Sequence, residues 1–282
     1  MVKFGVAGNS NSFYAEGHKH TEEAAAWCRD RGLDLFEYSF GKGIKMTSAK
    51  ANAIGQAFAS AGIELSAHAP YYINFANSDD EKIQGSIRYV IGTLEKLKEF
   101  DNGDRIVVHP ATQGKDERDV AVQRARTNLE KLADAIISAG LDSYKICLET
   151  MGKKGQIGTV GEIVDFCKIA PFFYPCVDFG HVNAREGGIL KREEDFAAII
   201  RYMSERLPEE KVKNMHVHFS KIMFGESGEI KHLTFEDRIY GPSFEPFSNV
   251  IKQFELQPHI ICESDGTQAE DARTMKDIYF NL

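Results

Sequence analysis

The sequence lacks a long apolar run, a cysteine framework and an excess of basic residues. No apolar stretch reaches the roughly 18 residues that a membrane-spanning helix needs, and the first residues, Met1-Val2-Lys3-Phe4-Gly5, begin like a strand and not like a signal peptide. The five cysteines lie far apart without a CxxC spacing, which argues against both a disulfide framework and a zinc finger. We therefore expect a cytoplasmic protein with buried, reduced thiols and no membrane association.

The charge balance excludes one class of nucleic-acid-binding protein. Lys and Arg together number 34 and Asp and Glu number 42, which gives a formal net charge of −8. A protein that coats DNA through a basic surface would not have this composition. An enzyme that acts on nucleic acid stays possible, because bound divalent metal ions offset carboxylates that the count treats as bare.

Short strand-like runs alternate with amphipathic helical segments along the whole chain. Apolar residues recur at helical spacing in the segments 83–97, 124–139 and 196–207. Eight such alternations favour a single (β/α)8 TIM barrel that spans residues 1–282. An open doubly wound sheet would need a glycine-rich phosphate loop after its first strand, and Gly5-Val6-Ala7-Gly8-Asn9 does not have that pattern. The expected strands are Lys3–Ala7, Asp34–Tyr38, Ile63–Ala67, Arg105–His109, Lys145–Glu149, Tyr174–Asp178, Asn214–Phe219 and His259–Glu263.

Histidines and carboxylates gather where the expected strands end. In a barrel the strand ends form the active-site face, and six successive strands bring imidazole or carboxylate groups to it, with two further histidines in adjacent loops. Taken singly, a histidine after an apolar run is more often a hydrogen-bonded structural residue than a metal ligand, and a carboxylate at a strand end often caps the next helix. Several carboxylates around one narrow mouth would repel one another, so the set predicts a multinuclear site for zinc or manganese. These residues are His68, His109, Glu149, Asp178, His181, His216, His232 and Glu263.

Three other residues are weaker candidates. Tyr71 and Tyr72 follow His68 in a loop, where an aromatic ring can stack on a base. Glu37 lies within an apolar run and either lines the pocket or hydrogen-bonds a neighbour.

Six stretches of the chain together resemble endonuclease IV, the second family of apurinic/apyrimidinic endonucleases, within the xylose-isomerase-like barrels. The resemblance is greatest to the archaeal-type branch and covers nearly the whole chain. The stretches are His68-Ala69-Pro70-Tyr71-Tyr72-Ile73-Asn74, Val107-Val108-His109-Pro110, Leu148-Glu149-Thr150, Cys176-Val177-Asp178-Phe179-Gly180-His181, Met215-His216-Val217-His218-Phe219-Ser220-Lys221 and Ile261-Cys262-Glu263-Ser264.

The resemblance implies up to three zinc ions, with manganese possible at one site. It assigns His68, His109 and Glu149 to the first ion, and the bridging Glu149 with Asp178, His216 and Glu263 to the second. It assigns His181 and His232 to the third ion. The bacterial branch has an Asp two residues before that last His, where this chain has Ile230. Glu229 or His218 could take its place.

The activity implied by the resemblance is metal-dependent hydrolysis of the DNA phosphodiester 5′ to an abasic site, in base excision repair. Glu149 and Glu263 would be the catalytic residues, since they would position the ions and orient the attacking water. Tyr71 and Asn74 would contact the substrate, which is DNA with abasic sites, and no obligate protein partner is evident. Four cations in or next to βα loops either meet the phosphates of the substrate or are solvated surface charges: Lys153, Lys154, Arg185 and Lys221.

A second function on the same barrel stays open. The set Glu149, Asp178, His216 and Glu263 is also the single-metal set of a sugar isomerase or epimerase. Only His68 and His109 separate the two, because phosphoryl transfer benefits from paired ions and an isomerase needs no second one. We favour the endonuclease on that chemistry, and a metal-binding barrel without catalysis is a third possibility.

Overall fold

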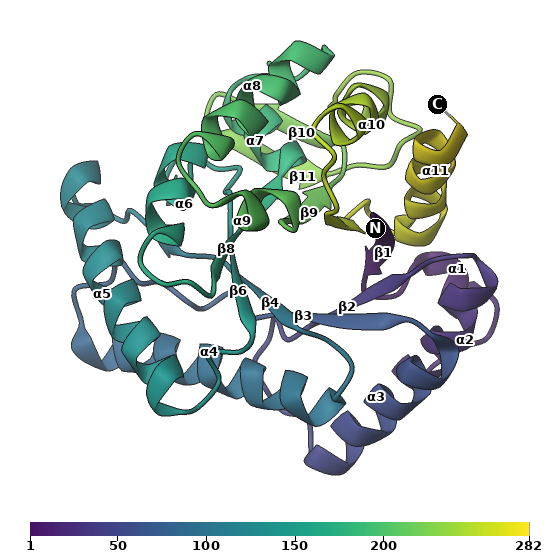
Figure 1. Ribbon diagram of the computed structural model, residues 1–282, viewed down its shortest axis with the longest axis horizontal. Coiled ribbons are helices and arrows are strands. Elements are labelled where there is room, and N and C mark those ends of the chain that lie inside the picture. The colour runs from purple at the N-terminus through teal and green to yellow at the C-terminus, as the bar shows by residue number, and fades with distance from the viewer. Residues whose placement is uncertain (282) are drawn as a thin grey trace.

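Eight parallel strands close into a barrel in the computed structural model, which describes residues 1–281 (Figure 1). Around the barrel the strand order is β1-β12-β9-β8-β6-β4-β3-β2, so strands consecutive among these eight are neighbours and β12 closes on β1. The expected (β/α)8 barrel is confirmed, with strand ends shifted by one or two residues. The strands are β1 (Lys3–Ala7), β2 (Leu35–Ser39), β3 (Glu64–His68), β4 (Arg105–Val108), β6 (Lys145–Glu149), β8 (Phe173–Asp178), β9 (His216–Phe219) and β12 (His259–Cys262).

Helices surround the strands, as Figure 1 shows. The longest are amphipathic and bury one face on the barrel. In α4, Ile83, Ile87, Val90 and Leu94 are buried at helical spacing, and the Asp79 side chain caps the first turn by accepting from the N–H of Glu81. The helices are α1 (Asn11–Ala15), α2 (Thr21–Asp30), α3 (Ser48–Ala61), α4 (Asp80–Phe100), α5 (Arg118–Ser138), α6 (Val160–Cys167), α7 (Phe179–Arg185), α8 (Glu193–Ser204), α9 (Glu209–Lys213), α10 (Phe244–Gln253) and α11 (Gln268–Asn281).

Two small sheets on the βα loops were not expected from the sequence. Strands β5 (Ala111–Thr112) and β7 (Gln156–Ile157) pair across two loops, and β10 (Ile222–Gly225) pairs with β11 (Gly228–His232) in a hairpin after β9. Two to five residues are too few for a recognisable alternation. Both sheets shape the face at which the barrel strands end.

The described part of the chain, residues 1–281, contains neither a disulfide nor a helix long and apolar enough to cross a membrane. All five cysteines are buried as free thiols, as the sequence predicted.

Candidate metal centre

The ends of the barrel strands enclose a pocket of about 470 Å³. Its lining combines ligands from β3 and β6, the loops after β4 and β12, helix α7 and strand β11. Histidines and carboxylates predominate, which is unusual because most binding pockets are lined chiefly by apolar side chains. The lining residues are Ala7, His68, Tyr71, His109, Glu149, Met151, Lys153, Gln156, His181, Glu229, His232, Glu263 and Gln268.

A first group of donor atoms consists of His68, His109 and Glu149. Oε2 of Glu149 lies 3.3 Å from Nε2 of His68 and 3.0 Å from Nε2 of His109. The other ring nitrogen of His68, Nδ1, lies 2.8 Å from the carbonyl oxygen of Ala69, and because a carbonyl only accepts, Nδ1 carries the proton. The Nε2 lone pair of His68 is therefore available to a metal ion.

A second group consists of Glu149, Asp178, His218 and Glu263. Nδ1 of His218 lies 3.4 Å from Oε1 of Glu149 and 3.4 Å from Oε1 of Glu263. Oδ1 of Asp178 accepts from the N–H of His181 at 2.7 Å, whereas its Oδ2 is buried without a hydrogen-bond partner. Glu149 belongs to both groups, one carboxylate oxygen facing each.

The second group corrects the sequence-based prediction, which placed His216 in it. Both histidines of β9 face the barrel interior, because residues two apart on a strand point the same way. In the register of β8 and β9, however, His218 pairs with Asp178, and His216 pairs with Cys176, one layer farther from the pocket. His218 therefore occupies the place predicted for His216.

A third group consists of His181, Glu229 and His232. Oε2 of Glu229 lies 3.4 Å from Nε2 of His181, and its Oε1 lies 3.9 Å from Nε2 of His232. The Nδ1 atoms of the two histidines are held by the carbonyl oxygen of Thr150 and the hydroxyl of Ser220, each at 2.9 Å. Of the two residues considered in place of Ile230, the structure puts Glu229 here.

A β-bulge explains how Glu229 and His232 share a face although they are three residues apart. The β10–β11 register jumps so that Lys231 pairs with Met223 and Glu229 pairs with Phe224, which leaves Ile230 without a partner. Ile230 is 58% exposed and points away from the pocket. In a regular strand, residues three apart face opposite sides. The extra residue Ile230 therefore lets the side chains of Glu229 and His232 face the same side.

Close contact with the loop after β6 fixes the position of the hairpin. The N–H of Glu229 donates to the carbonyl of Gly152 at 3.1 Å, and Gly228 bridges to Lys153. Gly228 has φ +92°, and a Cβ on it would collide with the carbonyl oxygen of Gly152, so both the conformation and the space require glycine. Glu229 is thereby placed beside His181.

The electrostatics of the pocket fit a metal cation. Burial, together with the neighbouring charges of Glu263 and Glu149, raises the pKa of Asp178 to about 6 despite the opposing charge of His181. Burial lowers the pKa of His218, but the facing carboxylates outweigh it and raise that pKa well above its ordinary value. The facing histidines, in turn, outweigh burial and lower the pKa of Glu149 and of Glu263. The buried Oδ2 of Asp178, which makes no hydrogen bond and lies 3.3 Å from Nδ1 of His181, is available among these imidazole and carboxylate donors to a metal ion.

Of the predicted substrate contacts, Tyr71 reaches the pocket and Asn74 does not. The Tyr71 side chain is 56% exposed, and its ring stacks on His109 with centroids 5.3 Å apart. The amide oxygen of Asn74 is occupied by the backbone N–H groups of Ala76 and Thr112, at 3.0 Å each. Asn74 therefore holds the loop in shape, because its acceptor is already used within the protein.

Of the four cations predicted in the βα loops, two lie at or near the pocket and two are bound by backbone carbonyl oxygens. Lys153 lines the pocket and Lys154 is exposed nearby. Arg185 is buried and donates to the carbonyl oxygens of Met151, Lys153 and Gln156, among others, and Lys221 donates to those of Phe235 and Asp237. Arg185 and Lys221 thus stabilise loops and are not free to meet phosphates, contrary to the sequence-based prediction.

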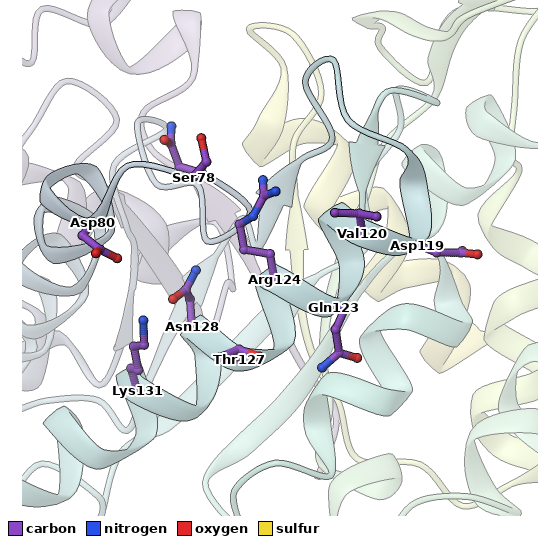
Figure 2. A pocket seen from close by; sticks show the side chains of 10 residues that line it. Ser78, Asp80, Asp119, Val120, Gln123, Arg124, Thr127, Asn128 and Lys131 are labelled. Carbon is purple, nitrogen blue, oxygen red and sulfur yellow. The ribbon is translucent and has the colours of Figure 1, made fainter.

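Two other places in the described chain are poorer candidates. A surface depression between the start of α4 and α5, shown in Figure 2, is lined by Val120 and by polar residues. Among these, the Arg124 guanidinium is already paired with Asp116 at 2.6 Å. At the opposite end of the barrel, Glu64, Asp104 and His259 form another donor group. Its carboxylates are already paired with Lys3, Arg105 and Lys145, so this group needs no added cation.

Comparison with known proteins places the chain in one family. A family model described as xylose isomerase-like TIM barrel matches residues 25–278. An uncharacterized protein of Methanocaldococcus jannaschii is 30% identical over 276 residues, which cover 98% of this chain and 96% of that protein. A probable endonuclease 4 of Mycoplasmoides gallisepticum is 34% identical over 115 residues, which are 40% of this chain and 36% of that protein.

Solved structures with this fold include enzymes that act on sugars. The 3-keto-D-glucoside 4-epimerase of E. coli matches with a TM-score of 0.70 at 16% sequence identity, covering 100% of both chains. At that identity the likeness concerns the fold alone.

Proposed function

The chain belongs to the xylose isomerase-like TIM-barrel family, and on that premise we propose that it is a metal-dependent phosphodiesterase that cuts DNA on the 5′ side of abasic sites. The observation that carries the proposal is the shared position of Glu149. One carboxylate joins a group of two histidines to a group of two carboxylates and a histidine, and a third group lies next to them. Paired ions are the arrangement that hydrolysis of phosphate diesters exploits.

The chain's own residues would divide the work as follows. His68, His109 and Glu149 would hold one ion, Glu149, Asp178, His218 and Glu263 a second, and His181, Glu229 and His232 a third. Bound divalent ions supply positive charge for the phosphate oxygens and activate water near neutral pH. Glu263, whose side chain is 17% exposed at the pocket mouth, is placed to orient that water or accept its proton.

Two findings support DNA as the substrate. The partial match to a probable endonuclease 4 concerns a protein named for nuclease activity. The pocket mouth also carries an exposed aromatic ring, Tyr71, and a lysine, Lys153, which are the two kinds of side chain that bind a base and a phosphate.

A second candidate function is a sugar epimerase or isomerase. The second donor group, with its two glutamates, is by itself a single-metal set of the kind that sugar-converting enzymes use, and an epimerase is among the structures with this fold. In that case the first and third groups would be unused, which is why we place this function second.

Counting ions and comparing substrates tests the proposal. The protein is loaded with zinc, dialysed and analysed for metal per chain, then assayed on an abasic duplex and on a panel of free ketoses. We expect two or three ions and cleavage of the duplex. A single ion together with interconversion of a ketose and its epimer would reject the phosphodiesterase and establish the second candidate.

Substitutions at the pocket mouth should separate stacking from charge. We expect Tyr71→Ala to weaken binding of an abasic duplex by roughly 1–3 kcal/mol without changing its salt dependence, since stacking does not release counterions. Lys153→Ala/Lys154→Ala should flatten the log–log salt slope, by roughly 0.9 for each phosphate that the variant no longer neutralises. Fluorescence anisotropy at several salt concentrations measures both.

The exposed Lys168, which follows the last residue of α6, pairs with Asp165 and does not line the pocket, gives the control Lys168→Ala. This variant should leave the slope unchanged. If Tyr71→Ala and Lys153→Ala/Lys154→Ala both bind the duplex as the parent does, DNA does not occupy this mouth.

A further inference from the structure

A buried polar cluster fills the barrel directly beneath the second donor group. It consists of Glu37, Ser66, His216 and His218, all at most 3% exposed. Oε1 of Glu37 accepts from Nε2 of His218 at 2.9 Å, and its Oε2 accepts from the hydroxyl of Ser66 at 2.8 Å. Nε2 of His216 lies 3.0 Å from the same Oε2. One carboxylate therefore faces two imidazoles and a hydroxyl.

This contact determines which nitrogen of His218 faces the pocket. An ionised carboxylate only accepts, so the hydrogen bond requires the proton on Nε2 of His218 and leaves the lone pair of the neutral ring on Nδ1. Nδ1 is the nitrogen that lies 3.4 Å from both Glu149 and Glu263. The hydrogen bond from Nε2 to Glu37 thus determines that His218 contributes Nδ1 to the second group.

His218 is oriented in the opposite sense to other histidines of the centre. His68 and His181 each use Nδ1 to donate to a backbone carbonyl and keep Nε2 for the pocket. Those carbonyls belong to neighbouring loop residues and are present in any variant. The partner of His218 is a side chain on β2, which is separated from β9 by β1 and β12 in the barrel order.

We propose that Glu37 is a positioning residue that holds His218 as an Nδ1 ligand of the second group. The proposal rests on metal binding by that group, and it is independent of whether the substrate is DNA or a sugar. A carboxylate behind a metal-bound imidazole fixes the ring and increases its basicity, and loss of such a partner costs roughly 10–100-fold in metal affinity.

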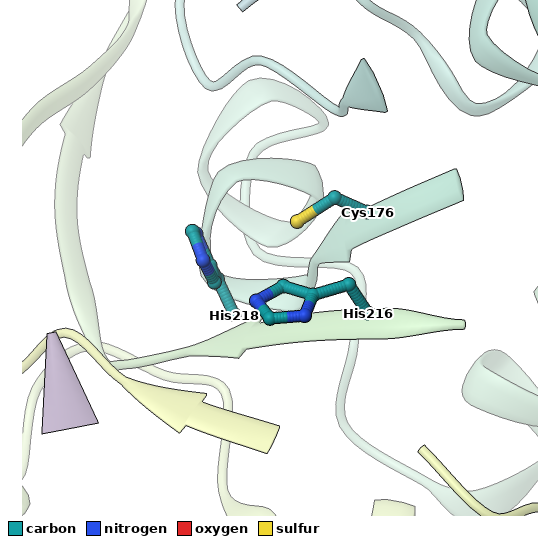
Figure 3. Close-up of side chains that lie close together, drawn as sticks. All are labelled: Cys176, His216 and His218. Atoms are coloured by element: carbon teal, nitrogen blue, oxygen red, sulfur yellow. The ribbon is translucent and has the colours of Figure 1, made fainter. Parts of the chain in front are cut away.

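An interior metal ion is the competing explanation. Figure 3 shows Cys176 and the two histidines of β9 close together. Nδ1 of His216 has no hydrogen-bond partner, and its Nε2 lies 3.0 Å from Oε2 of Glu37 without the geometry of a hydrogen bond. An ion among these three would have to take Nε2 of His218, the atom already bonded to Glu37, and would require one imidazole to serve two ions. The contacts therefore favour the positioning role.

The test measures zinc affinity rather than turnover. Competition with a chromophoric chelator gives the dissociation constants of the protein, and metal analysis gives ions per chain. We expect Glu37→Ala to weaken one zinc site roughly 10–100-fold. Glu37→Gln should retain most of the affinity, because the amide oxygen can still accept from His218 while the amide N–H donates to Ser66. In the metal-free protein, nitrogen-15 spectra of the histidines should show a protonated Nε2 for His218 in the parent and lose that signature in Glu37→Ala.

Glu64→Ala is the matched control, since Glu64 is also a strand carboxylate near a histidine, His259, but at the opposite end of the barrel. It should leave zinc affinity unchanged. If Glu37→Ala does not fold, Ser66→Ala, which removes one bond to Glu37, should still weaken zinc severalfold.

Unchanged zinc affinity and an unchanged His218 signature in every folded variant at Glu37 and Ser66 would overturn the proposal. Loss of one whole ion per chain in Cys176→Ser, with the other sites intact, would overturn it in favour of the interior ion. A parent that does not cleave abasic DNA, yet loses zinc affinity on Glu37→Ala, would reject the proposed function and leave the role of Glu37 standing.

Discussion

Glu149→Gln should abolish most of the activity on an abasic duplex, lowering kcat/KM by roughly 10³-fold, because loss of several kcal/mol of metal stabilisation corresponds to about that factor. The reason is the double membership of Glu149, whose two oxygens face the first and the second donor groups. An amide keeps the size of the side chain but removes the charge that two ions would share. Steady-state cleavage and metal analysis of the same samples measure the effect.

His232→Ala serves as the comparison within the centre, because it removes a ligand of the third group only. We expect a loss at least about ten times smaller than that of Glu149→Gln. Glu64→Gln, the same chemical change in the donor group at the opposite end of the barrel, should leave both activity and metal content unchanged. Equal activity and equal metal content in Glu149→Gln and His232→Ala would contradict the assignment of Glu149 as the shared ligand.

Removal of metal should have the second large effect, on activity and stability together. After treatment with a strong chelator we expect no cleavage above background and recovery on addition of zinc. A ligand present at 1,000 times its dissociation constant stabilises the native state by about 4.1 kcal/mol. For a chain of this size that corresponds to a fall in Tm on the order of 8 °C when the ion is withdrawn.

The physical cause is the crowding of carboxylates that the ions would relieve. Without a cation, burial and the charges of Glu263 and Glu149 hold the pKa of Asp178 near 6, far above that of an ordinary aspartic acid. Scanning calorimetry measures the Tm of the metal-loaded and the stripped protein, and Glu149→Gln is compared with the parent in both forms. The variant should show a smaller fall in Tm on stripping, since it would hold fewer ions at the start. An identical Tm before and after stripping of the parent would argue against resident metal.

The barrel was predictable because its signal is repeated eight times. Strand-like runs and amphipathic helices alternate from Lys3 to Cys262, and each repeat adds to the same inference. The gathering of His68, His109, Glu149 and Glu263 at one pocket follows from the fold, because parallel strands bring their carboxyl ends to one face.

The choice between His216 and His218 could not be made from alternation, since residues two apart on a strand share a face. Only the register with β8 says which of them lies level with Asp178. The resemblance to endonuclease IV led to His216, and the depth of each residue in the barrel corrects it. Glu37 was expected to line the pocket or to hydrogen-bond a neighbour, and it does accept from Ser66 on the adjacent strand β3. Its bond to His218 could not be foreseen, because β9 is not adjacent to β2.

The loops were the least predictable part. In the sequence, Arg185 and Lys221 cannot be distinguished from free surface cations. In the structure they donate to backbone carbonyl oxygens, and only the folded loops bring these oxygens together. The amide oxygen of Asn74 is also used within the protein, where it shapes the loop that was expected to meet the substrate. Side chains that hold loops and side chains that hold ligands are chemically alike.

The unpaired Ile230 has a consequence for how such ligand pairs are searched for in a sequence. In the bacterial branch the last histidine follows its acidic partner by two residues, whereas here the interval is three, and the bulge on β11 absorbs the difference. The bulge thus lets the carboxylate of Glu229 and the imidazole of His232 both face the pocket across an interval of three residues. A search that requires a fixed interval would miss the ligand pair in such chains, although both side chains still face the pocket.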